Sequence, residues 1–127
     1  RRLARAQFEE MLGRIQQVDG ANLLVAQVDV AGVDELREMA DWFRDKVSSG
    51  VAVFGTIHND KPMLIATVTE DLIQRGVKAG DLVREAARIV GGGGGGRPNL
   101  AQAGGRDPSK LPDALAAVPE LVSQALN

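Results

Sequence analysis

The chain has 127 residues, of which 44% are hydrophobic and 25% are charged, a balance typical of one globular domain with its own core. It has no cysteine and one histidine, which excludes disulfides and thiolate chemistry and argues against a structural zinc site. The net charge of −2 argues against a general nucleic-acid-binding surface. The sequence has no run of about 18 apolar residues, so we expect no membrane-spanning helix.

The N-terminus lacks the apolar core and cleavage site of a secretory signal. Together with the lack of cysteine, this leads us to expect a cytoplasmic protein that does not contact a membrane. The chain begins in mid-pattern with Arg1 rather than methionine, so we expect a fragment of a longer protein.

Apolar residues recur at three- and four-residue steps over residues 2–18 and predict a helix. They are Ala4, Phe8, Met11, Leu12, Ile15 and Val18. We assign residues 1–19 as an N-terminal helix that is a linker or a possible dimerisation helix, because its apolar stripe fits either this domain or a second chain. Residues 20–127 are then the globular domain.

The next segments alternate between strand and helix patterns. Residues 22–30 and 51–57 are apolar runs typical of strands, and residues 34–48 between them have a helical pattern. This order predicts a parallel βαβ unit with a right-handed crossover. Residues 63–69 add a strand through a hairpin, so we expect an α/β fold with a small mixed β-sheet and packed helices.

The second half predicts further helices around one unusual segment. Residues 70–75 suit a short helical turn and residues 79–90 a helix, whereas residues 100–103 suit a short edge strand. The tail over residues 111–126 is helical by periodicity, and Pro119 has to kink or split it.

The unusual segment is residues 91–105, which read GGGGGGRPNLAQAGG. Glycine allows the backbone to approach a ligand closely and to adopt positive φ, but it loses the most conformational entropy on folding. Flexible linkers are usually Gly/Ser mixtures between domains, whereas this run follows an apolar helix and precedes polar side chains. We therefore predict a glycine-rich binding loop rather than a spacer.

The chemistry of this segment differs from that of a nucleotide-binding loop. It lacks the Lys-Ser/Thr of a Walker loop, and it follows a helix C-terminus rather than preceding an N-terminus. It offers backbone amides to an anion or a flat surface, with Arg97 as the charge. Asn99 and Gln102 add donors and acceptors for base or ribose edges, although both also fit a structural role in the loop.

No catalytic or metal-binding constellation is expected. The sequence has no Ser/His/Asp or Cys/His set, and His58 lies in a predicted hairpin turn without a cluster of carboxylates. We therefore assign no catalytic residue and no metal ligand.

The segment Gly80–Gly105 closely resembles the C-terminal, DHH-associated domain of alanyl-tRNA synthetases. The resemblance is carried by the helix ending at Ile89-Val90, the glycine run, the Arg97-Pro98 step and the closing Ala-Gln-Ala-Gly-Gly, and it extends over nearly the whole chain. It implies a non-catalytic domain that binds the elbow of alanine tRNA, where the D and T loops meet, and helps aminoacylation and editing share one tRNA. The implied partners are the catalytic and editing domains of the same chain. No cofactor is implied for this domain, and ATP, magnesium and zinc are implied for the parent ligase.

The RNA contacts that we expect come from the segment after the helix and from two arginines before it. Those of the segment are Gly92, Gly93, Gly94, Gly95, Gly96, Arg97, Asn99 and Gln102. Arg84 and Arg88 are added as phosphate neighbours from the charge pattern alone, since residues 70–110 hold seven basic against five acidic residues.

Three alternatives stay open. Related domains of DHH phosphoesterases grip a substrate phosphate with a Gly-Gly-Gly-His loop, but here Arg97 follows the glycines and no DHH catalytic domain is present. A second alternative is a dimerisation module that uses the N-terminal helix. The same domain also fits a free-standing alanyl-tRNA editing protein.

Overall fold

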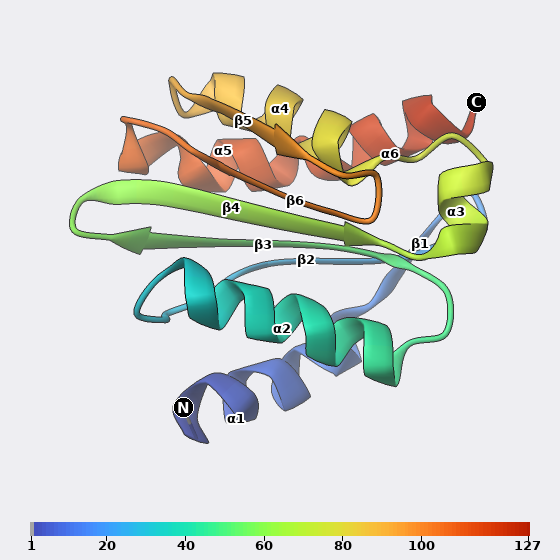
Figure 1. Cartoon of the computed structure of the whole chain (residues 1–127), viewed down its shortest axis with the longest axis horizontal. Helices are drawn as coiled ribbons and strands as arrows, with labels where there is room; N and C mark the ends of the chain where they lie inside the picture. The colour runs from blue at the N-terminus through green and yellow to red at the C-terminus, as the bar shows by residue number, and fades with distance from the viewer. Residues whose placement is uncertain (1) are drawn as a thin grey trace.

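The structure, a computed structural model, describes residues 2–127, with side chains from Ala4 onward, and its centre is a six-stranded sheet (Figure 1). The strands are β1 Gln16–Val18, β2 Ala21–Gln27, β3 Val51–His58, β4 Lys61–Val68, β5 Gly93–Gly96 and β6 Leu100–Gly104. They lie in the order β1-β2-β3-β4-β6-β5, with β2 and β3 parallel and the other neighbours antiparallel. The predicted mixed sheet is confirmed.

Helices cover both faces of the sheet (Figure 1). One face carries α1 Arg2–Met11 and α2 Val33–Lys46, and the other carries α4 Ala79–Ile89, α5 Leu111–Ala116 and α6 Val118–Leu126. The short helix α3 Glu70–Gln74 links β4 to α4. The α2 helix connects the parallel strands β2 and β3, as predicted for a βαβ unit.

The central strand β3 is buried on both faces. Val51 and Val53 belong to the core beneath α4, α5 and α6, whereas Ala52 and Phe54 belong to the core beneath α1 and α2. Successive side chains of a strand point to opposite faces, so a strand covered on both sides needs apolar residues at every position. This explains the continuous apolar runs in the sequence.

The N-terminal helix is shorter than predicted. It ends at Met11, a 3-10 turn η1 follows over Leu12–Arg14, and β1 then pairs with β2. Asp19 and Gly20 have φ angles of 49° and 85° and form the tight hairpin turn between these strands. The prediction of a helix to residue 18 is therefore wrong, because the apolar periodicity continued into residues that pair in the sheet.

The apolar stripe of α1 packs within this chain. Ala4, Phe8 and Met11 are at most 3% exposed and share a core with α2. The Phe8 ring lies 5.7 Å from the Trp42 ring, and the Arg5 guanidinium lies 4.8 Å from the Trp42 ring centroid. These three apolar side chains are therefore not available to a second chain, whereas Leu12 and Ile15 are half-buried, and dimerisation through the assigned segment 1–19 stays a prediction. Its first residue, Arg1, lies outside the described residues.

The glycine run forms a strand, not the predicted loop. Gly93–Gly96 is β5, at the edge of the sheet, and it forms an antiparallel hairpin with β6. The segment predicted as a short edge strand, residues 100–103, lies in β6 between β4 and β5. Glycine is depleted in strands, so the sequence has no side-chain pattern that indicates β5.

The C-terminal tail divides as Pro119 requires. The helical segment breaks at Ala117 into α5 and α6, and Pro119 lies in the first turn of α6, where no intrahelical partner is lost. Before it, Asp107 caps the 3-10 turn η2 Pro108–Lys110 by accepting a hydrogen bond from the Ser109 amide at 3.1 Å. The predicted division of the tail at Pro119 is confirmed.

The end of α6 is tied to the turn between β1 and β2. The Asp19 carboxylate accepts hydrogen bonds from the Ser123 hydroxyl at 2.6 Å and from the Asn127 side-chain amide at 3.0 Å. These two bonds favour the ionised carboxylate and lower the pKa of Asp19 below its ordinary value of 3.8. The C-terminal end of α6 is therefore fixed to the hairpin at the β1 edge of the sheet.

Replacing Phe43 with alanine should lower the free energy of unfolding by about 3–5 kcal/mol, because this fully buried ring fills the space between α2 and the sheet. Urea unfolding followed by circular dichroism measures the change. Asp45→Ala, at an exposed position of the same helix, is the control and should shift stability by less than about 0.5 kcal/mol. A loss below about 1 kcal/mol for Phe43→Ala would show that α2 is not packed on the sheet as described.

Candidate functional site

The glycine run begins as the C-terminal cap of α4. The Gly91 amide donates to the Arg88 carbonyl at 3.1 Å, and the Gly92 amide donates to the Ala87 carbonyl at 2.9 Å. This pair of bonds is a Schellman motif. Gly91 has a φ of +71°, a conformation that favours glycine. The chain thus leaves the helix and enters β5 within a few residues.

Over residues 92–95, at the start of β5, the glycines fall into two alternating sets. A Cβ atom placed on Gly92 or Gly94 would lie 1.9 Å or 2.4 Å from a carbonyl oxygen of β6, far inside van der Waals contact. A Cβ on Gly93 or Gly95 would meet no heavy atom of the described chain within 4 Å. The fold therefore requires glycine at 92 and 94, whereas steric packing within the chain does not require it at 93 or 95.

A tight turn, Arg97–Asn99, joins β5 to β6. The Arg97 amide donates to the Leu100 carbonyl at 3.0 Å, and the Asn99 carbonyl accepts from the Val68 amide at 3.1 Å and the Thr67 hydroxyl at 3.0 Å. The turn backbone is thereby fixed to the end of β4. The Arg97 and Asn99 side chains are exposed, and in the part of the chain that the structure describes neither hydrogen-bonds to another residue.

A polar hollow of about 510 Å³ opens beside this strand and turn. Its polar side chains are Arg37, Arg44, Arg97, Asn99 and Gln102, and the Gly95-Gly96 backbone forms part of its wall. A second hollow of about 330 Å³ shares Gln102 and is lined by Val33, Met63, Gly93, Ala103 and Gly104. We call these two hollows and their lining residues the glycine groove.

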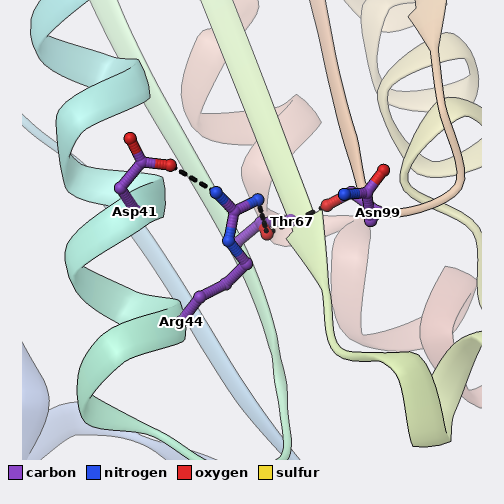
Figure 2. Close-up of polar contacts among 4 residues, drawn as sticks. All are labelled: Asp41, Arg44, Thr67 and Asn99. Carbon is purple, nitrogen blue, oxygen red and sulfur yellow. Dashed lines mark hydrogen bonds and ion pairs between the residues drawn. The ribbon is translucent and has the colours of Figure 1, made fainter.

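Arg44 links α2 to the Arg97–Asn99 turn, as Figure 2 shows. Its guanidinium forms an ion pair with Asp41, and a second guanidinium nitrogen lies 3.4 Å from the Thr67 hydroxyl oxygen. That hydroxyl in turn donates to the Asn99 carbonyl. Arg44 therefore supports the turn in addition to lining the groove.

Arg37 and Arg44 were not predicted as site residues. They lie seven positions apart on α2, close to two helical turns, and so share one side of the helix. Several acidic residues flank these two arginines on α2. The sequence alone therefore indicated an ordinary solvent-exposed helix face. The seven-residue spacing was the available signal, because it places both arginines on one side of the helix. The sequence does not show that this side lies beside β6.

Arg84 and Arg88 do not line the glycine groove. Both lie on α4, which packs on the face of the sheet opposite α2. Arg84 pairs with Asp81 at 2.7 Å, and Arg88 pairs with Glu85 at 3.3 Å. Their role as phosphate neighbours stays a prediction, and it concerns a surface apart from the groove.

Other kinds of site have little support in the residues described. Across residues 2–127, no three His, Asp or Glu side chains are gathered as metal ligands. His58 is exposed at the end of β3, where the hairpin turn was predicted. None of the helices in this range has the length and apolar character needed to cross a bilayer.

Comparisons with known proteins point to one family. The DHHA1 domain family model matches residues 20–124. The alanine–tRNA ligase of Chloroflexus aurantiacus is 50% identical over 122 residues, and that of Dehalococcoides mccartyi strain BAV1 is 48% identical over 122 residues. In both comparisons the match covers 96% of this chain but only 14% of the ligase. The crystal structure of the C-Ala domain from Aquifex aeolicus alanyl-tRNA synthetase matches with a TM-score of 0.76 and 31% identity, over 86% of this chain and 97% of that one.

The two sets of glycines should respond differently to alanine. Gly94→Ala should destabilise the fold by about 1–3 kcal/mol or more, because the new methyl group meets the backbone of β6. Gly95→Ala should leave stability unchanged or raise it by up to about 1 kcal/mol, because its methyl group enters open space and the unfolded chain loses freedom. Thermal unfolding of both variants measures this contrast. Equal losses at the two positions would contradict the alternation.

Proposed function

This chain belongs to the DHHA1 domain family, in the form found in the C-terminal region of alanyl-tRNA synthetases, and from that premise we propose that its glycine groove binds alanine tRNA at the elbow. The domain holds the tRNA while the catalytic and editing parts of the synthetase act on it in turn. The parent protein is then an alanine–tRNA ligase of the cytoplasm that uses ATP, magnesium and zinc outside this domain.

One observation carries this proposal: bare glycine backbone lies beside converging arginines. Gly93 and Gly95 offer a surface without side chains, and the same groove is lined by Arg37, Arg44 and Arg97. Folded RNA is recognised through its shape, its phosphates, its 2′-hydroxyls and the exposed bases of loops. Close approach to a flat base pair with nearby cations suits such a target.

The alternatives receive less support. The matched relatives named above are ligases rather than phosphoesterases or free-standing editing proteins. Ala4, Phe8 and Met11, three residues of the N-terminal stripe that suggested a dimerisation helix, are buried within the chain. The groove stays the only feature of the described residues for which we propose a function.

The test is a titration of this chain against transcribed alanine tRNA and against the same tRNA with its D-loop/T-loop pairing disrupted, at low and moderate salt. We expect binding to the intact tRNA and a large loss with the disrupted elbow. Gly95→Ala should reduce affinity at least about tenfold, since its methyl group would separate the RNA from the backbone. Equal binding to both tRNAs would overturn the elbow contact. No binding of the wild-type chain to either would overturn the RNA-binding function.

Arg97→Ala should weaken tRNA binding and reduce its salt dependence by about one counterion, because an exposed guanidinium that contacts a phosphate releases one bound ion. The slope of log affinity against log salt measures the change. Arg14→Ala removes the same charge from an exposed position next to β1, at the opposite edge of the sheet, and should leave the slope unchanged. If both variants retain the wild-type slope, the phosphate contact is not made by Arg97.

A further inference from the structure

We propose that Gln102 is the residue that recognises a hydrogen-bond acceptor on the bound RNA, and that Arg37 is the positioning residue that keeps the Gln102 amide turned as a donor. This inference rests on the proposed RNA-binding function of the glycine groove and specifies the chemistry at its centre. The group that meets Gln102 is an acceptor, either on a base edge, such as a guanine N7 or O6, or on the sugar–phosphate backbone.

The register of the sheet places Gln102 on the floor of the groove. It lies on β6 directly opposite Ile65 of β4 and Gly95 of β5. Directly opposed residues on antiparallel strands point to the same face, and Ile65 belongs to the core beneath α2. The Gln102 side chain therefore stands on the α2 side of the sheet. Since Gly95 has no side chain, nothing from its position covers Gln102 on the side toward the sheet edge.

Arg37 determines whether the oxygen or the amino group of the Gln102 side chain is available to a ligand. Its Nη2 atom donates to the Oε1 atom of Gln102 at 2.7 Å, across the groove from α2 to β6. A guanidinium group has donors and no acceptor, so the amide oxygen of Gln102 has to face Arg37. The amino group of Gln102 then points away from Arg37, and within the described residues it has no hydrogen-bond partner.

The consequence is selectivity for acceptors. A glutamine side chain that rotates freely presents either its oxygen or its amino group. Held by Arg37, Gln102 presents N–H groups, so a ligand acceptor gains hydrogen bonds and a ligand donor meets another donor. Both Arg37 and Gln102 are exposed, and a hydrogen bond between exposed side chains adds little to stability.

The decisive variant is Gln102→Glu, tested by equilibrium binding to transcribed alanine tRNA. The new side chain has nearly the same shape and attracts Arg37 more strongly, but it has no N–H donor and carries a negative charge. We expect affinity to fall at least about tenfold while the unfolding temperature is unchanged or raised. Gln16→Glu makes the same charge change at an exposed position on β1, the opposite edge of the sheet, and should keep affinity within about twofold.

A double-mutant cycle tests the role of Arg37. Gln102→Met removes the donors without adding charge, and Arg37→Met removes the positioning group. If Arg37 acts through Gln102, Arg37→Met should weaken binding in the wild-type background and much less in the Gln102→Met background. Equal effects of Arg37→Met in the two backgrounds would overturn the positioning role.

Two further comparisons separate the possible outcomes. The first uses a transcript in which the D-loop/T-loop base pair at the elbow is exchanged for another complementary pair. If the acceptor is on a base, the ratio of wild-type affinity to Gln102→Met affinity should shrink with this transcript. If the acceptor is on the sugar–phosphate backbone, the ratio should persist. If the wild-type chain binds tRNA and Gln102→Glu binds as well as Gln16→Glu, this inference is overturned while RNA binding stands. If the wild-type chain does not bind, the proposed function itself fails.

Discussion

The close approach of two backbones, those of β5 and β6, is the constraint on which the edge of this fold depends. A side chain at position 94 would lie 2.4 Å from the backbone of β6, so β5 can occupy its place only as glycine at that position. The same closeness extends to α4, because a Cβ on Gly80 would lie 3.1 Å from the Gly96 carbonyl oxygen. The edge strand is thus enclosed between β6 and α4, and the constraint acts on alternate residues. The intervening residues, Gly93 and Gly95, also have no side chains. The glycine strand that fits beside β6 therefore leaves its backbone exposed in the groove.

The sequence predicted those parts of the fold that side chains encode. The apolar period of α2 and α4 and the dense runs of β2, β3 and β4 indicated a mixed α/β sheet, and Pro119 indicated the division of the tail. Two errors have a common cause. The strand β5 has no side chains, and β1 continues the apolar spacing of the helix before it, so neither has the pattern by which strands are recognised. Both are strands because a partner backbone lies alongside, which is a long-range property.

The candidate site was predictable only in part, for the same reason. Arg97, Asn99 and Gln102 are close in sequence and line one hollow, whereas Arg37 and Arg44 reach it from α2, more than fifty residues earlier. Charge counting had favoured Arg84 and Arg88 instead, yet these lie on the opposite face and pair with carboxylates of their own helix. A local surplus of charge does not reveal which face of a sheet will carry it. The arginines of the groove are brought together only because α2 packs beside β6.

The modest charge of the groove bears on how it would recognise RNA. One of its three arginines is paired with Asp41, a second is hydrogen-bonded to Gln102, and the chain as a whole carries a net charge of −2. Proteins that bind nucleic acid chiefly through phosphates neutralise many of them and lose affinity steeply with salt. Three arginines provide a small electrostatic contribution, so discrimination has to come from shape and from the orientation of polar groups. The elements that fix both are the bare strand β5, the turn anchored to β4 and the Arg37–Gln102 pair. Rigid geometry with weak charge suits a domain that recognises the shape of a folded RNA rather than one that binds nucleic acid chiefly through its phosphates.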